Sequence, residues 1–298
     1  MNMVSQTNPP EKPSRGVTLW MQKHAIFSFF VLAYAISWIL TIPVILAEWQ
    51  VVPKNYFTFQ FFFTIKSFGP FAAAYIMTRI IEGPEGWLGM KKRIRMWNLG
   101  WKWYAFILLG IPAMMLLGIS LIPGALASFQ GLPPYFAINY LVSFVLIFFG
   151  GGPLGEEPGW RGFALPRMQA RWGALRGTLL LGVLWTFWHL PDFLTTAQKG
   201  GPGAGLYPFY AGLPIFFIEV LALAVLFSWV YNRTDGSLFA ALLLHTSYNT
   251  FSVVLPLFSA PSVTSTDLPF AIVTTAAAVL ILAATRGRLG YRPHAVQG

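Results

Sequence analysis

The stretch Gly155-Glu156-Glu157-Pro158-Gly159-Trp160-Arg161 places two adjacent carboxylates and an arginine between long apolar runs. Residues 137–149 before it carry no charge, and residues 179–188 after it are almost entirely apolar. The chain has only 10 acidic residues in all, and two of them stand here side by side. A charged side chain at membrane depth costs about 3 kcal/mol on insertion scales and therefore marks a functional site by default. We expect the chemistry of this protein at Glu156 and Glu157.

The overall composition is far more apolar than that of a soluble protein. Hydrophobic residues make up 56% of the 298 residues, charged residues make up 10%, and the mean hydropathy is +0.60. Soluble domains carry about 25% charged residues. Because backbone polar groups in lipid must be satisfied internally, these values predict an all-α membrane protein. The chain contains no cysteine, which excludes a disulfide framework, a thiol nucleophile and a cysteine-based metal site.

Eight apolar stretches approach the roughly 20 residues that a membrane-spanning helix needs. We expect spans at about 24–47, 57–79, 103–128, 137–156, 174–192, 208–231, 236–258 and 267–285. The fourth should continue as a helix towards Met168, with bends at the glycines and prolines of 150–153 and 158–159. The predicted fold is a polytopic bundle of about eight transmembrane helices.

The distribution of basic residues predicts the topology of these spans. With a cytoplasmic N-terminus, the outer loops hold only Lys54 and Lys199, and the other Lys and Arg residues of the loops face the cytoplasm. This asymmetry predicts an even number of spans with both termini cytoplasmic. The expected organisation is a polar N-terminal tail (1–18), a single transmembrane domain (19–286) and a cytoplasmic C-terminal tail (287–298).

The net charge of +10 points to lipid and not to nucleic acid. The basic residues stand mostly between apolar segments, where they meet anionic lipid headgroups. We therefore predict the lipid bilayer as a partner and no nucleic-acid partner. No small-residue cleavage site follows the first apolar run, so we interpret the N-terminal segment as a tail and not as a signal peptide.

Further polar residues in apolar sequence complete a candidate site. His189 follows the run 179–188, and His245 and Asn249 belong to the span 236–258. Residues four apart share one face of a helix, so His245 should align with Asn249 and Glu157 with Arg161. Glu156 then lies about 100° around the helix from Glu157 and faces elsewhere.

This division of the two carboxylates predicts different roles for them. Glu157 beside Arg161 should stay ionised and structural, because a neighbouring positive charge favours the charged form. Glu156 in an apolar cavity is suited to act as a general base, holding and deprotonating a water together with His189. His245 and Asn249 offer N–H donors for an oxyanion. Together these are the parts of a hydrolase that uses water directly, without a covalent intermediate.

Three motifs in order carry a family resemblance: Glu156-Glu157-x-x-x-Arg161, Trp185-x-x-x-His189 and His245-x-x-x-Asn249. They resemble those of the CAAX prenyl protease and bacteriocin-processing family of intramembrane glutamic endopeptidases, and Glu156 to Pro166 is similar to bacterial members in particular. The resemblance covers about 140–255 and suits an eight-span layout.

The resemblance implies a CAAX-type endopeptidase without a cofactor, acting on a membrane-associated protein or peptide substrate in a bacterial cell membrane. It implies Glu156 as the base that activates water and His189 as its partner, supported by Glu157 and Arg161. It also implies an oxyanion hole formed by His245 with Asn249. The family's second motif usually begins with Phe, and this chain has Trp185; we expect Trp185 to pack beside His189 without taking part in the reaction.

Two alternatives stay open at this point. A metal-dependent membrane hydrolase would use Glu156, Glu157, His189 and His245 as ligands, and those residue types suit zinc. The chain has no His-Glu-x-x-His motif, however, and Arg161 would compete with a cation, so we predict no metal site. The other alternative is a non-enzymatic immunity or transport protein, because proton-coupled carriers also bury Glu and His.

Three more polar groups within or beside spans have open roles. Lys66 either faces the bundle interior or extends to an interface, and Glu219 either pairs with Lys66 or faces the cavity and binds substrate. Asp192 is expected to mark the end of a span.

Overall fold

The computed structural model describes residues 16–150, 152–260, 263 and 267–293. Residues 1–15 of the predicted N-terminal tail and residues 294–298 of the predicted C-terminal tail, including His294, lie outside these residues. The division into two tails and one transmembrane domain stays a prediction. The described part of the chain is helical, and its extended backbone meets in one bridge between Phe129 and Phe258.

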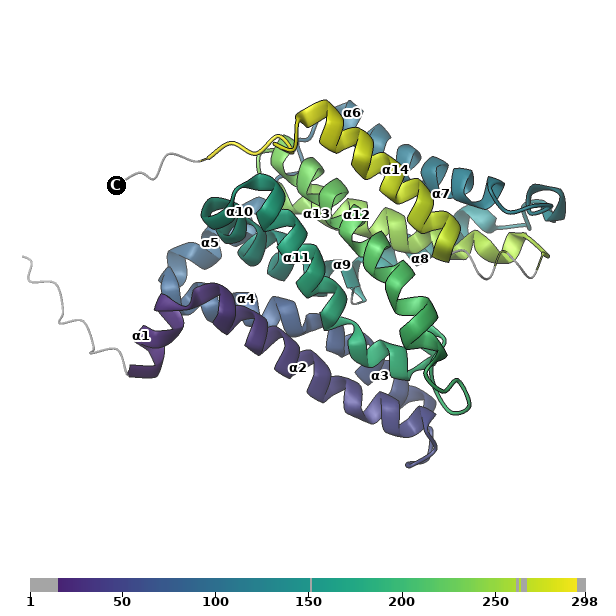
Figure 1. Cartoon of the computed structure of the whole chain (residues 1–298), viewed down its shortest axis with the longest axis horizontal. Coiled ribbons are helices and arrows are strands. Elements are labelled where there is room, and N and C mark those ends of the chain that lie inside the picture. Colours follow the sequence, from purple (N-terminus) through teal and green to yellow (C-terminus); the bar gives the residue numbers. More distant parts are fainter. Residues whose placement is uncertain (1–15, 151, 261–262, 264–266, 294–298) are drawn as a thin grey trace, which may run out of the picture.

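The α-helices are numbered along the chain as in Figure 1. They are α1 (Gly16–Lys23), α2 (Ala25–Glu48), α3 (Tyr56–Ile65), α4 (Gly69–Ile81), α5 (Gly83–Ile94), α6 (Trp101–Ala105), α7 (Ile111–Ser120), α8 (Phe136–Phe149), α9 (Gly152–Glu157), α10 (Leu165–Trp172), α11 (Ala174–Trp188), α12 (Leu213–Arg233), α13 (Leu238–Thr250) and α14 (Asp267–Thr285).

Short helical turns of other types connect several of these helices. The π-helical turns are η2 (Phe106–Gly110), η4 (Pro158–Ala164) and η7 (Pro208–Gly212). The 3₁₀ turns are η1 (Lys66–Phe68), η3 (Leu126–Ser128), η5 (Leu190–Leu194), η6 (Thr196–Gln198), η8 (Phe251–Val253) and η9 (Leu255–Leu257).

Six segments of the described chain are long and apolar enough to cross a membrane. They are Ala25–Glu48, Trp101–Ser120, Phe136–Trp172, Pro208–Arg233, Leu238–Leu257 and Asp267–Thr285. The prediction of a polytopic all-α membrane bundle is therefore confirmed. The helix expected to run on towards Met168 is present as α9, η4 and α10.

The other two predicted spans are helical but interrupted or short. Residues 57–79 form α3 and α4 with the 3₁₀ turn η1 between them. Helix α11 has 15 residues, so it is only about 22 Å long, against a hydrocarbon core of about 30 Å. The count of eight spans therefore stays a prediction.

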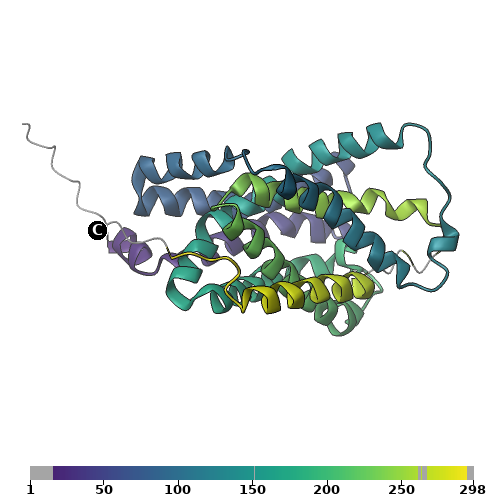
Figure 2. The ribbon, with the colours of Figure 1, turned by 90° about the horizontal axis from the view of Figure 1, so that it is seen from above.

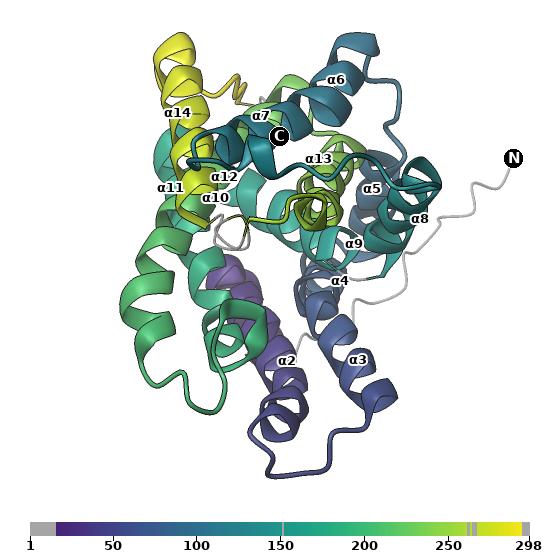
Figure 3. The same cartoon turned by 90° about the vertical axis from the view of Figure 1, so that its right-hand side faces the viewer.

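Helix α9 lies in the middle of the bundle (Figure 3), where it contacts α4, α8 and α13. On one side of it α2 packs along α4, and on the other α12 packs against both α11 and α14. Seen from above, α14 runs along one edge of the molecule (Figure 2). The central position of α9 removes its side chains from the surrounding lipid.

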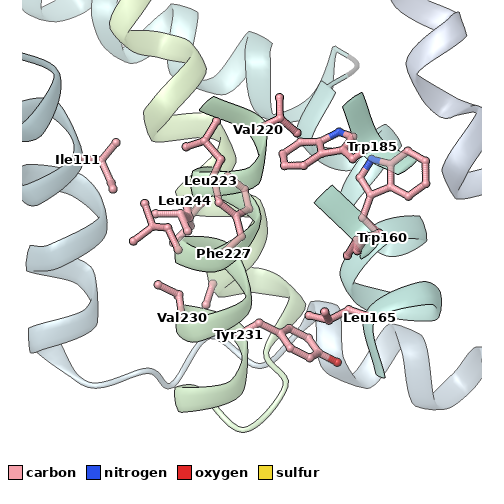
Figure 4. Packing of buried hydrophobic residues seen from close by; sticks show 14 of the residues in the cluster. Ile111, Trp160, Leu165, Trp185, Val220, Leu223, Phe227, Val230, Tyr231 and Leu244 are labelled. Atoms are coloured by element: carbon pink, nitrogen blue, oxygen red, sulfur yellow. The ribbon is translucent and has the colours of Figure 1, made fainter. Parts of the chain in front are cut away.

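The apolar core joins the segments that carry the candidate site. Trp160 on η4 and Trp185 on α11 approach each other beside Phe227 on α12 and Leu244 on α13 (Figure 4). Trp160 and Leu244 are fully buried, and Trp185 is 4% exposed. Because lipid tails are as apolar as these side chains, close van der Waals packing stabilises the helix contacts in the bundle.

Two glycines let α9 and η4 pack directly on the turn between α3 and α4. A Cβ atom on Gly155 would lie 2.5 Å from the carbonyl oxygen of Ser67, and one on Gly159 would lie 2.5 Å from Cβ of Pro70. Small residues four apart allow such close backbone contact between membrane helices. Glu156 and Glu157 stand between these two glycines, so the close contact fixes the depth of both carboxylates.

We predict that Gly155→Ala destabilises the protein by about 1–3 kcal/mol, because the added methyl group must displace the Ser67 backbone. The measurement is thermal unfolding of the purified protein in detergent. Gly89→Ala is the control, since a Cβ atom on Gly89 in α5 meets nothing within 4 Å. Equal unfolding temperatures for the two variants would contradict the close contact.

Candidate active site

Glu156 and Glu157 lie where α9 passes into the π-helical turn η4. Both are buried, with 5% and 0% of the residue exposed. Pro158 begins η4 and has no N–H to donate, and the π turn carries the helix past it. Single π turns within α-helices are frequent at functional sites.

Glu157 is held by two cationic or polar partners. Its Oε1 atom accepts a hydrogen bond from Arg161 Nη1 at 3.0 Å, which is the contact that the four-residue spacing predicts. The same oxygen is 2.8 Å from Nδ1 of His245 on α13. Both Glu157 and Arg161 are fully buried. This pair therefore connects η4 to α13 and has no access to a substrate.

Two aromatic rings enclose the guanidinium group of Arg161. Its Cζ atom is 4.3 Å from the ring centre of Trp185 and 4.4 Å from that of Phe227. Desolvated cation–π contacts of this kind contribute about 2 kcal/mol. The positive charge therefore stays within a closed environment made by α11 and α12.

Glu156 has a different environment, made by two tryptophans. Its Oε2 atom accepts a hydrogen bond from Trp185 Nε1 at 2.8 Å and another from Trp160 Nε1 at 3.1 Å. Figure 4 shows the two indoles with their nitrogen atoms turned towards each other. With Oε2 occupied on this side, Oε1 is the oxygen that remains for a further partner.

His189 caps the C-terminal end of α11, one turn after Trp185. Its Nδ1 atom is 2.9 Å from the backbone oxygen of Trp185. A carbonyl oxygen only accepts, so Nδ1 carries the proton in this hydrogen bond. In the neutral ring the other nitrogen, Nε2, is then an acceptor, as a group that takes a proton from water must be.

A cavity of about 360 Å³ brings three of the six predicted site residues together. Glu156, His189 and Asn249 all line it, and so do Lys66 and Asp192. Its volume lies at the lower end of the range for ligand pockets, about 300–1,000 Å³. Glu156 and His189 therefore face one space, as the helical geometry of the two carboxylates predicts.

A second cavity of about 100 Å³ adjoins the first, since His189 and Asn249 line both. His245 also lines it. Because His245 donates from Nδ1 to Glu157, it offers an N–H to an oxyanion only from Nε2 in the doubly protonated form. The amide of Asn249 is a donor without this condition.

The structure distinguishes between the alternatives for the remaining buried polar groups, because Lys66 faces the bundle interior and Glu219 lines the smaller cavity. Lys66 forms an ion pair with Asp192 on the wall of the larger cavity, and not with Glu219. Glu219 instead accepts a hydrogen bond from the hydroxyl group of Tyr248. Asp192 thus does more than mark the end of a span, because it compensates the charge of Lys66.

The sequence analysis missed the tryptophans as partners of the base. Trp185 packs near His189, with ring centres 6.2 Å apart, but its indole N–H also reaches Glu156. Trp185 therefore packs beside His189 as expected and in addition donates to Glu156, a contact that the sequence analysis did not predict. The available signal was the replacement of the usual Phe by Trp, which adds an N–H donor at that position.

No three His, Asp or Glu side chains of the described residues gather in a way that could hold a metal ion. His24, at the start of α2, lies away from the site. The absence of a metal site therefore stays a prediction.

Comparison with known proteins identifies the segment that carries the site. Residues 137–251 match the family model described as Rce1-like, type II CAAX prenyl endopeptidase. Over 180 residues the chain is 27% identical to CAAX prenyl protease 2 of Methanococcus maripaludis, and this match covers 59% of the chain and 64% of that relative. The chain thus spans a little under two thirds of the relative's length.

The matched segment contains all six predicted site residues: Glu156, Glu157, Arg161, His189, His245 and Asn249. The chain is therefore a multi-pass helical protein whose site segment, residues 137–251, is similar to the Rce1-like, type II CAAX prenyl endopeptidases.

Proposed function

We propose that this protein is an intramembrane endopeptidase that hydrolyses a peptide bond with a water molecule activated by Glu156 and His189. One observation carries the proposal. Glu156, His189 and Asn249 share the wall of one cavity, while Glu157 and Arg161 are tied together behind it. In this proposal the three residues on the cavity wall contact the substrate, and the buried ion pair stabilises the helices that carry them.

The reaction begins with a water molecule between the free oxygen of Glu156 and Nε2 of His189. One of these two acceptors takes a proton from the water, and the resulting oxygen attacks the carbonyl carbon of the peptide bond. The tetrahedral intermediate then loses its amine when the C–N bond breaks and the nitrogen receives the proton. The products are a carboxylic acid and an amine, and no bond forms between enzyme and substrate.

Asn249 is the preferred donor to the oxyanion in this scheme. It lines both cavities, so its amide stands beside His189 and close to any carbonyl group that the water attacks. His245 joins it from Nε2 only when both of its ring nitrogens carry a proton, because Nδ1 donates to Glu157. A preorganised donor of this kind contributes about 10²–10³ in rate.

The two tryptophans position the base. Hydrogen bonds to Oε2 of Glu156 from Trp160 and Trp185 fix the carboxylate plane and direct Oε1 away from the indoles. Catalytic groups must be held within a fraction of an ångström of their productive geometry, which a long, flexible Glu side chain does not achieve alone.

We further propose that both termini face the cytoplasm and that the substrate is a membrane-associated protein or peptide. Helix α1 and the segment after α14 lie towards the same end of the bundle (Figure 1), which supports termini on one side. The printed name of the relative, a CAAX prenyl protease, supports a peptide substrate.

Glu156→Gln should lower the rate of peptide cleavage at least about 100-fold, because the amide keeps the shape of the side chain but accepts no proton. The assay is cleavage of a membrane-peptide mixture by the protein in proteoliposomes, followed by mass spectrometry. Glu85→Gln on the exposed surface of α5 is the matched control. Undiminished cleavage by Glu156→Gln would overturn the mechanism. If the wild-type protein cleaves no peptide but gives the cell a transport or protection phenotype, a non-enzymatic role would be favoured.

Arg161→Met should destabilise the protein by about 3–5 kcal/mol, because it leaves the carboxylate of Glu157 buried without its cation. The double variant Glu157→Gln/Arg161→Met should be less destabilised than Arg161→Met, since it removes the uncompensated charge. Thermal unfolding in detergent measures both. A double variant that is less stable than the single one would rule out a bracing ion pair.

Trp185→Phe should lower kcat about tenfold and leave KM and the unfolding temperature nearly unchanged, because the ring remains and only the N–H donor to Glu156 is lost. Steady-state kinetics of peptide cleavage separate these effects. Trp103→Phe on α6, far from the cavity, is the control. An unchanged kcat in Trp185→Phe would show that the hydrogen bond does not position the base.

A further inference from the structure

Glu219 is a buried carboxyl group that the proposed mechanism does not use. It lies on α12 with 7% of the residue exposed, next to the apolar residues Ile218 and Val220. An ionisable group at this depth in a membrane bundle is costly and usually functional. The other buried acids of the site have clear partners, whereas no Lys or Arg of the described chain lies within ion-pair distance of Glu219.

One hydrogen bond holds Glu219, and it leaves half of the carboxyl group unused. The hydroxyl group of Tyr248 donates to Oε1. No described residue donates to Oε2. Tyr248 directly precedes Asn249 in α13, so this hydrogen bond places Glu219 beside the residues of the third motif.

Glu219 and Tyr248 both line the smaller cavity, whose wall also includes candidate catalytic residues. His189, His245 and Asn249 contribute polar atoms to it, and Phe216 and Leu223 contribute apolar surface. Because His189 and Asn249 also line the larger cavity, the small cavity opens next to the position where the peptide bond would be cleaved. A side chain attached beside that bond is the part of a substrate that would enter it.

The volume limits the size of that side chain. The cavity measures about 100 Å³, and an apolar cavity of about 150 Å³ is known to hold benzene with its six heavy atoms. Side chains of about four heavy atoms therefore fit, and those of Lys, Arg and the aromatic residues do not. The free carboxyl oxygen adds a chemical condition, because a buried acceptor that no described residue satisfies calls for a hydrogen-bond donor from the substrate.

We propose that this cavity is a specificity pocket for a small side chain with a hydrogen-bond donor, such as that of Asn or Thr, next to the scissile bond. The assignment rests on the proposed peptidase function. Glu219 is the residue that determines the preference, and Tyr248 orients it. Pockets built around a hydrogen bond discriminate strongly against an analogue that lacks the donor, because their own polar group is left unpaired.

The test compares peptides that match in shape and differ in the donor. Quenched fluorescent peptides carry Asn or Leu, and Thr or Val, at the residue before or after the cleaved bond, and kcat/KM is measured in proteoliposomes. The wild type should prefer Asn over Leu and Thr over Val by at least about tenfold at one of the two positions. Equal rates for both pairs at both positions would overturn the proposal.

Two variants should move this preference in opposite directions. Glu219→Leu removes the acceptor and should reduce the ratio to about one or below. Tyr248→Phe removes the internal donor, leaves both oxygens of Glu219 to the substrate, and should raise the ratio. Glu85→Leu on the surface is the control. A ratio that stays at the wild-type value in an active Glu219→Leu or Tyr248→Phe protein would refute the pocket.

Binding separates a failure of this inference from a failure of the proposed function. The same peptide pairs are titrated against Glu156→Gln protein, which retains the pocket but lacks the base. If the wild type cleaves no peptide and the donor peptides still bind about tenfold more tightly, the pocket stands and the mechanism falls. If cleavage occurs and neither rates nor affinities depend on the donor, the pocket falls and the mechanism stands.

Discussion

A charge within this bundle must find its compensation from other parts of the same chain, because lipid offers none. The structure compensates some of its buried charges by ion pairs and one by hydrogen bonds from neutral groups. Arg161 neutralises Glu157 within one helical turn, and Lys66 is neutralised by Asp192 from a distant segment. Glu156 accepts hydrogen bonds from two neutral indole N–H groups and forms no ion pair with a Lys or Arg of the described residues. Its other oxygen is left for a water molecule in the cavity that Glu156 lines.

Close backbone packing makes this arrangement possible at the centre of the molecule. The glycines on either side of the Glu156-Glu157 pair bring α9 against the turn η1 and η4 against the start of α4. The two carboxylates then point away from that contact in two directions, one to α13 and one to the cavity. A wider separation of these helices would open space for lipid tails or water behind the site.

Local geometry was predictable from the sequence, and contacts across the bundle were not. The pairing of Glu157 with Arg161 follows from a four-residue spacing, because one helical turn fixes it. The partner of Lys66 lies 126 residues away, and no periodicity encodes that distance. The hydropathy pattern predicted the helical bundle, but it could not show that α11 would be as short as 15 residues. Helical spacing and residue chemistry predicted roles for the six motif residues, and the resemblance implied the same roles residue by residue.

Trp185 joins the two proposed proton acceptors through a single residue. Its indole N–H contacts Glu156, and its backbone oxygen contacts Nδ1 of His189. The separation of carboxylate and imidazole therefore depends on the covalent frame of one amino acid more than on the packing of α9 against α11. Thermal motion that shifts α11 along its axis carries both contacts with it. The water site between them would consequently have a smaller positional spread than the helices around it.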